Sequence, residues 1–493
     1  MNVSGSGQLI LAGSNTFTGA INLGSGTLAF GANSLGTGPL TAGGGTLCWL
    51  PGNAQDLCAG RTVAFTGTVS LDPDGNTVAL SGGIGGAGGL TLSAGNGGAL
   101  VLAGSNSYAG LTTINAGQLV AADPASLGST ANYTTPVGGT ATSSLGLQGG
   151  ITLAEPIRCG GRQPLPNASA LAAHVINLGG TNTLMGDLTA ETGGNQYNIE
   201  SATGRLIVAG NYSQVSGTGD RYLNLQGAGD ADWTGAINNG TGIINLTKRG
   251  AGRWILSGTN TFTGTTRVSE GTLLVNGVLG TNTVTVSNNA TLGGNGIISG
   301  GATVRDGGTL APGSSIGKLT VNNSLTLAAG SRTLMEIGKS PLTNDEVVVS
   351  GALALGGTLA VTNLSTQKPF AGDSFQLFHA SNLTGNFTNV VLPPLNPGLA
   401  WTNTLTGNGA IAVIATVSLN STNISFATTN GGATLVLFWP QDHLGWQLQA
   451  KTNPPGAGLG ANWFDVAGST ATNQISLPMD ASQGTVFYRL ILQ

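Results

Sequence analysis

Short apolar runs closed by glycine alternate with stretches rich in threonine, serine and asparagine over most of the chain. Three of these runs open nearly the same phrase, GQLILAGSNTFTG at 7–19, GALVLAGSNSYAG at 98–110 and GRWILSGTNTFTG at 252–264. Short β-forming runs bounded by glycine predict strands, and runs with little polar alternation predict buried strands. Glycine suits the sharp corners between them because it adopts positive φ without strain. The pattern therefore predicts an all-β fold.

The three phrases belong to a longer internal repeat. In each copy a further glycine follows the phrase at a fixed spacing, and a Leu-Gly pair follows soon afterwards; these landmarks stand at 26 and 35–36, 117 and 127–128, and 271 and 279–280. The offsets between copies that start at 7, 98 and 252 are near-multiples of about 22 residues, a length that suits one coil of a β-helix. We therefore predict a right-handed parallel β-helix over residues 1–416, with about 18 coils and a length of about 85 Å.

The repeated positions are expected to be structural rather than chemical. Asparagine satisfies backbone groups at a corner, the aromatic side chain packs beside it, and glycine turns the chain. Across the three copies these positions are Gly13, Asn15, Phe17, Gly19 and Gly26; Gly104, Asn106, Tyr108, Gly110 and Gly117; and Gly258, Asn260, Phe262, Gly264 and Gly271. On this interpretation Gly19→Val should damage folding locally, whereas Ser14→Ala should matter little.

The pattern changes after residue 416. Aromatic residues become dense, as in LVLFWPQDHLGWQLQ and VFYRLILQ, and the Gly-Thr-Leu phrases stop. We predict that residues 417–493 form a small β-sandwich-like module with its own aromatic core. Trp439, Trp446 and Trp463 are expected to pack in that core; the alternative is that they stack on a sugar.

Composition narrows the range of partners. The chain has 493 residues, 84 of them glycine, and only 7% are charged, against roughly 25% in typical domains. A net charge of −4 without a basic stripe argues against nucleic acid and anionic membranes. No apolar run reaches the roughly 18 residues of a transmembrane helix, and MNVSGSGQLI resembles no secretory signal. Cys48 and Cys58 either close one small loop or remain thiols.

Residues 246–275, LTKRGAGRWILSGTNTFTGTTRVSEGTLLV, closely resemble the autotransporter-associated β-strand repeat, and the other two copies resemble it too. The tail, with GWQLQ and FYRL, resembles one carried by repeat proteins of Verrucomicrobia-like bacteria. The resemblance implies a β-helical passenger at the bacterial surface. It does not extend to a translocator barrel, because the segment 417–493 is too short for one. We expect an N-terminal truncation or a misplaced start codon, since the chain starts inside a repeat and no leader precedes it.

From this resemblance we expect a non-catalytic protein of the cell surface, outer membrane or extracellular space, acting in adhesion, surface structure or display. Its expected partners are glycans or neighbouring cell surfaces, and its expected form is a monomeric rod. No cofactor or metal is expected.

One alternative function is a glycan-binding tail, residues 417–493, on an inert stalk. The other is that of a polysaccharide lyase or glycoside hydrolase, since β-helices include both. Such an enzyme needs clustered carboxylates, and the best candidates are Asp220, Asp230 and Asp232 in GDRYLNLQGAGDADW. We favour solvation of exposed loops as the explanation of these three carboxylates. The basic cluster Lys248, Arg249 and Arg253 belongs to the repeat and is interpreted as a corner feature.

Overall fold

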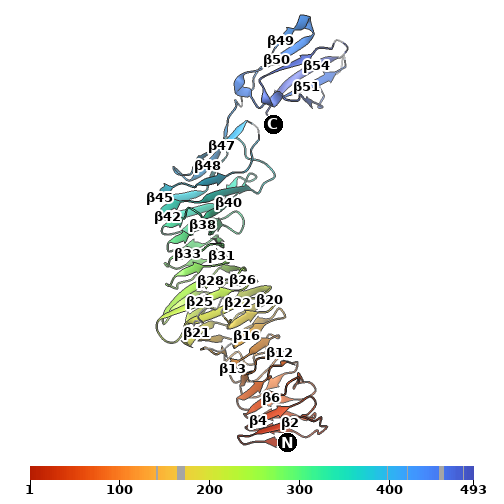
Figure 1. Cartoon of the computed structure of the whole chain (residues 1–493), viewed down its shortest axis with the longest axis vertical. Helices are drawn as coiled ribbons and strands as arrows, with labels where there is room; N and C mark the ends of the chain where they lie inside the picture. Colours follow the sequence, from red (N-terminus) through yellow and green to blue (C-terminus); the bar gives the residue numbers. More distant parts are fainter. Residues whose placement is uncertain are drawn as a thin grey trace.

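The computed structural model describes residues 1–139, 143–163, 172–396, 398–418, 420–454, 460–480, 482 and 484–492. The chain forms a long stack of short strands that ends in a small module at the C-terminus (Figure 1). The stack is a parallel β-solenoid of about 15 turns, and the C-terminal sheets are antiparallel. The predicted all-β fold, a parallel β-helix followed by a small β module, is confirmed. Within the described part of the chain, no helix is long and apolar enough to cross a membrane.

The solenoid is built from ladders in which each strand pairs with strands one coil away. The first ladder lies in the earliest coils and contains β1 (Asn2–Val3), β3 (Ile21–Leu23), β5 (Leu40–Ala42), β7 (Val63–Phe65) and β10 (Ile84–Gly85). The second ladder contains β2 (Gln8–Leu11), β4 (Thr27–Phe30), β6 (Thr46–Trp49), β8 (Val69–Asp72), β11 (Leu90–Ser93), β13 (Thr112–Ala116), β15 (Thr134–Pro136), β18 (Ile157–Gly161), β21 (Leu188–Gly193), β24 (Tyr212–Gln214) and β27 (Ile237–Gly240).

Two further ladders carry the solenoid toward its C-terminal end. The third contains β9 (Thr77–Leu80), β12 (Ala99–Leu102), β14 (Gln118–Ala121), β16 (Ser144–Leu147), β19 (Val175–Asn177), β22 (Gln196–Ser201), β25 (Asp220–Gln226), β28 (Ile243–Lys248), β30 (Thr266–Val268), β33 (Val284–Val286), β36 (Ala302–Val304), β39 (Leu325–Leu327), β42 (Glu346–Leu355) and β45 (Phe378–Gly385), with a side branch of β32 (Val278–Leu279), β35 (Ile297–Ile298) and β38 (Lys318–Val321) that joins at β42. The fourth contains β17 (Thr152–Leu153), β20 (Thr181–Leu184), β23 (Arg205–Val208), β26 (Asp230–Trp233), β29 (Arg253–Leu256), β31 (Gly271–Val275), β34 (Ala290–Gly294), β37 (Thr309–Pro312), β40 (Arg332–Gly338), β43 (Thr358–Asn363) and β46 (Asn389–Val391), and β41 (Thr343–Asn344) pairs with β40.

Coil length varies, and this corrects the expected coil count. In a short coil Thr291 pairs with Thr309, whereas in a much longer one Ile157 pairs with Leu188. Coil length is therefore not uniform at about 22 residues, and the solenoid has about 15 turns rather than the expected number of about 18. At about 4.8 Å per coil the solenoid is about 70 Å long.

The three repeat copies, in contrast, all give coils of one length. Gln8 pairs with Thr27, Ala99 with Gln118 and Arg253 with Thr272, so the chain advances by the same number of positions in each copy. The repeat is thus the sequence of a short, tightly closed coil.

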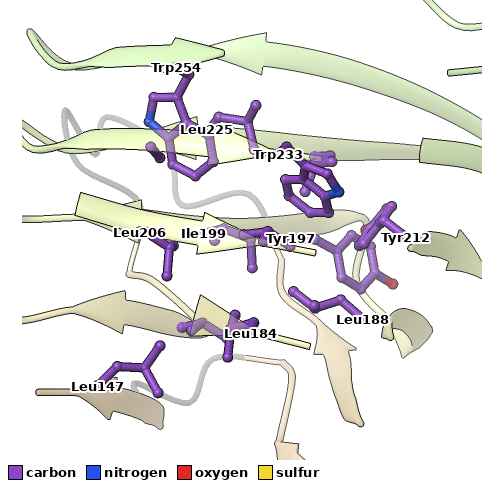
Figure 2. Close-up of a cluster of buried hydrophobic side chains, with 14 of the residues drawn as sticks. Leu147, Leu184, Leu188, Tyr197, Ile199, Leu206, Tyr212, Leu225, Trp233 and Trp254 are labelled. Atoms are coloured by element: carbon purple, nitrogen blue, oxygen red, sulfur yellow. The ribbon is translucent and has the colours of Figure 1, made fainter. Parts of the chain in front are cut away.

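One buried apolar cluster runs through the interior of the solenoid from Val3 to Ile411. In its middle, Tyr212 makes edge contacts with Tyr197 and Trp233 at centroid separations of 6.4 and 6.0 Å. Figure 2 shows these rings among leucine side chains from successive strands. Aromatic pairs of this kind contribute about 0.5–1.5 kcal/mol beyond the area they bury.

An antiparallel sheet follows the last coils. It contains β44 (Ser374–Gln376), β47 (Leu399–Thr404) and β48 (Ala410–Ala415). Phe375 and Ile411 from this sheet belong to the buried cluster of the solenoid, so the sheet extends the same core.

The C-terminal module has a separate core. Its two three-stranded sheets are β49 (Ser425–Thr429), β50 (Thr434–Phe438) and β53 (Gln474–Pro478), and β51 (Gln447–Asn453), β52 (Phe464–Asp465) and β54 (Thr485–Ile491), with short 3₁₀ turns η1 (Asn430–Gly432), η2 (Gln441–His443) and η3 (Ser469–Ala471). Side chains from both sheets pack around Leu437, Trp439 and Leu448. All three cysteines of the chain are free thiols, so Cys48 and Cys58 do not close a loop.

The glycines of the repeat occupy places where coils touch, except Gly13 and Gly19 in the first coil. A Cβ atom on Gly264 would lie 2.3 Å from the carbonyl oxygen of Ile244 in the preceding coil, and one on Gly110 would lie 2.5 Å from the backbone of Gly89. At Gly19 no described atom lies within 4 Å of such a Cβ. The expectation that Gly19→Val damages folding is therefore wrong, because Gly19 lies in the first coil and no preceding coil of the described structure packs against it.

Gly264→Val is expected to destabilise the solenoid by about 1–3 kcal/mol, because the added side chain forces two coils apart. Gly19→Val is the matched control and should leave the thermal unfolding midpoint nearly unchanged. Circular dichroism of both purified variants measures the effect. Equal losses in the two variants would contradict the close approach of coils at this position.

Candidate functional site

The asparagine of the repeat links successive coils. The backbone N–H of Ile237, in the coil before, donates to Asn260 Oδ1 at 2.9 Å. The Asn260 side-chain amide donates to the carbonyl of Gly258 at 3.0 Å and to that of Val278, in the coil after, at 2.9 Å. Asn260 is almost fully buried. The carbonyls of Gly258 and Val278 also accept the backbone N–H groups of Val278 and Asn260, at 3.1 and 2.8 Å. The side chain of Asn260 therefore adds a second donor to each carbonyl and satisfies the Ile237 N–H.

The same arrangement recurs in the second copy and is reduced in the first. Ile84 N–H donates to Asn106 Oδ1 at 2.7 Å, and the Asn106 amide donates to the carbonyl of Ser126. Asn15 donates to the carbonyl of Ser34 at 2.8 Å but is exposed. The repeat asparagine is therefore buried wherever a coil covers it on both sides.

The aromatic residue of the repeat explains the Leu-Gly landmark. Tyr108 and Phe262 are fully buried. A Cβ atom on Gly128 would lie 2.6 Å from the Tyr108 carbonyl oxygen, and one on Gly280 would lie 2.6 Å from that of Phe262. The glycine one coil later is therefore needed because the backbone of the aromatic residue lies directly against it.

The three candidate carboxylates do not converge. Asp220 begins β25 in the third ladder, whereas Asp230 and Asp232 lie on β26 in the fourth. Asp230 pairs with Arg253 at 2.8 Å, and Asp232 pairs with Arg205. Among the described residues, no three His, Cys, Asp or Glu side chains are close enough to hold a metal ion. Two of the three carboxylates are thus partners of surface arginines, and the third lies on a strand of a different ladder.

Lys248 is a corner residue. Its buried ammonium group donates to the carbonyls of Arg249, Gly250 and Glu270 at 2.7, 2.6 and 3.1 Å. Burial lowers the pKa of Lys248 to about 8. The lysine therefore closes the corner between two coils of the third repeat copy.

The tryptophans of the C-terminal module differ in burial. Trp439 and Trp446 are 3% and 9% exposed and pack inside the module. Trp463 is half-buried, and the Arg489 guanidinium lies over its ring at 4.3 Å. The faces of Trp439 and Trp446 are therefore covered by protein, and the face of Trp463 that lies under Arg489 is occupied as well.

Several buried ionisable residues were not singled out from the sequence. His174 accepts the Asn198 N–H at Nδ1 and donates from Nε2 to the Gly160 carbonyl at 2.8 Å, so it is held neutral. Burial lowers the pKa of His174 to about 3. The guanidinium of Arg162, also buried, donates to backbone carbonyls. An ionisable residue inside an otherwise apolar, strand-length run is a sequence signal for a buried ionisable group. The run alone does not show which of its side chains point into the core.

Glu155 is the buried carboxyl with the clearest consequence. The Thr134 hydroxyl donates to Glu155 Oε1 at 2.7 Å, while Oε2 is buried without a partner in the described structure. Burial raises the pKa of the Glu155 carboxyl to about 8. In the folded protein the Glu155 carboxyl therefore keeps its proton over a pH range in which the same carboxyl of the unfolded chain is ionised.

Asn260→Ala is expected to lower the free energy of unfolding by about 1–3 kcal/mol, because it leaves the backbone N–H of Ile237 without the side-chain acceptor at the buried corner. Asn15→Ala removes the same side chain from an exposed corner and should cost less than about 1 kcal/mol. Urea denaturation followed by tryptophan fluorescence compares the two. A larger loss for Asn15→Ala would overturn the bridging role.

Glu155→Gln should change how stability depends on pH. Because the folded pKa lies above that of the unfolded chain, the stabilising contribution is complete below pH 4.5 and is lost as the pH rises through about 8. Relative to the variant, the wild type should lose up to about 1.4 kcal/mol for each pH unit in this window. Thermal melts at steps of half a pH unit measure the difference in stability between the wild type and the variant. The lowered pKa of His174 makes stability depend on pH in the opposite direction, but it is present in both proteins and cancels in this difference. Parallel pH profiles would contradict a buried, protonated Glu155.

Comparison with known families agrees with this picture. The model of the passenger-associated-transport-repeat family matches residues 2–30, 96–121 and 246–275. These segments contain the three coil steps of equal length and their asparagine corners. The family does not indicate catalysis, and it implies an exported cell-surface protein. No curated protein matches the chain. With three such repeats in a parallel β-solenoid, the chain fits an autotransporter passenger-type repeat protein.

Proposed function

We propose that the protein is a non-catalytic, exported passenger that acts at the cell surface or outer membrane in adhesion, surface structure or display. The observation that carries this proposal is the setting of three transport repeats within a solenoid of about 15 turns. One uninterrupted core links the coils, so the solenoid is a stiff stalk whose length, rather than a reaction, is its main property.

The charge distribution supports a role without catalysis. Along the fourth ladder Arg205, Asp230 and Arg253 lie on successive strands in register. Both arginines are exposed in their ion pairs, Arg253 with the half-exposed Asp230 and Arg205 with the more buried Asp232. Such pairs contribute at most about 1 kcal/mol and need no catalytic explanation. A surface of low charge also approaches glycans and neighbouring cells without strong repulsion.

We further propose that residues 1–416 and 417–493 act as separate domains of a monomeric rod. The two separate buried clusters, one in the solenoid and one around Leu437, Trp439 and Leu448, support this division. The first domain would provide the extended surface, and the second would be a separately folded module.

Surface exposure tests the proposal in the bacterium that makes the protein. Antibodies against the solenoid should label intact cells, and external protease should remove the label. A cytosolic protein serves as the control for cell integrity. Labelling that appears only after the cells are lysed would contradict the proposal.

A further inference from the structure

A polar groove lies at the corner of the first three coils, near the N-terminal end (red in Figure 1). Its volume is about 430 Å³, within the range of small-molecule sites, roughly 300–1,000 Å³. It exists because the third coil is longer than the second. Thr27 pairs with Thr46, but Thr46 pairs with Ser70, which is a longer advance along the chain. The additional chain forms a loop whose residues 55, 56 and 59–61 make one wall of the groove.

The charged side chains of the groove are bound to the protein itself. Asp56 accepts the N–H of Cys58 at 2.8 Å and that of Ser81 at 3.0 Å. The Arg61 guanidinium donates to the carbonyl of Leu35 at 3.3 Å and to the next carbonyl along the chain. The two opposite charges are thus used to fasten the loop to its neighbours. A site of this kind favours neither an anion nor a metal cation.

Neutral groups remain available to a ligand. Asn33 and Thr37 are exposed along the groove, and neither side chain has a hydrogen-bond partner within the described structure. Gln55 Oε1 accepts the Asn33 N–H at 2.8 Å, which leaves the two Nε2 protons of Gln55 free among the described groups. Together these groups offer carboxamide donors and acceptors and one hydroxyl along the groove.

The floor is made of backbone and small residues. Gly36, Ala59 and Gly60 line the groove, and no aromatic ring is among its described lining residues. A planar nucleobase would therefore find no aromatic side chain to stack on among the described residues of the groove. A ring that carries many hydroxyl groups matches the available groups better, because each hydroxyl both donates and accepts.

We infer that this groove binds a neutral saccharide unit. This inference adds a class of ligand to the proposed surface role. It rests on the proposed function only for the location at which the protein would encounter the sugar. Because few groups make contact, a single site should bind weakly, with a dissociation constant of about 1 mM.

The test uses the purified full chain and a panel of trisaccharides. Cellotriose, maltotriose and chitotriose are the neutral probes, and trigalacturonic acid is the acidic one. Titration calorimetry should detect at least one neutral probe, and Asn33→Gly/Thr37→Val should weaken its binding about tenfold or more. Glycine at position 33 keeps the left-handed backbone, since Asn33 has φ of 60°.

A matched control is available in a distant coil. Asn289 also has φ of 60°, and Thr281 follows a Leu-Gly pair as Thr37 does. Asn289→Gly/Thr281→Val should therefore bind like the wild type. Thr37→Val alone provides a second test if the double variant unfolds early, and it should weaken binding severalfold.

Three outcomes would overturn the inference. These are no binding of any neutral probe at about 10 mM, unchanged binding in Asn33→Gly/Thr37→Val or in Thr37→Val, and equal weakening in the control. Failure of the inference would leave surface labelling of intact cells unaffected. Failure of export would likewise leave sugar binding by the purified protein intact, so the two results are distinguishable.

Discussion

Hydrogen bonding between consecutive coils is the interaction on which the rest of this structure depends. Strands of the solenoid pair with strands of neighbouring coils, about 4.8 Å away, so each side chain stacks on its counterpart. In the second ladder this places Leu28, Leu47 and Leu71 in one inward row. The same stacking explains the scarcity of charge, since like charges directly opposite each other are destabilising. Where charges do occur on adjacent strands, as at Arg205, Asp230 and Arg253, their signs alternate.

Strand pairing constrains the position and register of the strands and the conformation of the corners. It does not constrain the length of the chain that connects one strand to the next. The short coil from Thr291 to Thr309 and the long one from Ile157 to Leu188 therefore belong to the same stack. Added residues leave the core as loops, and a loop anchored on a rigid scaffold is a usual place for binding. In the third coil the added chain is fastened by Asp56 and Arg61, which leaves the neutral Asn33, Thr37 and Gln55 to face solvent. Variation in coil length thus creates a local groove in a fold that is otherwise built of similar coils.

The sequence predicted those features that repeat. The corner role of Asn106 and Asn260 follows from their phrase, and so does the need for glycine at 264. Features that occur once were harder to predict. The groove depends on two chain segments meeting across a coil, and the partners of Asp230 and Asp232 depend on register, neither of which a local pattern contains. Gly19 was misjudged because its phrase is the same as the others, while no coil of the described structure precedes its own.

The position of the groove couples binding to the least supported coils. In a solenoid each coil is stabilised by its neighbours, so a coil packed on one side only is the first to open. The first coil is of this kind in the described structure: Leu9 and Ile10 are 38% and 55% exposed, whereas Leu28 of the next coil is fully buried. The groove includes Asn15 from that first coil as well as residues of the second and third. A ligand that binds only the closed coils stabilises them by mass action. Occupation of the groove would therefore order these coils.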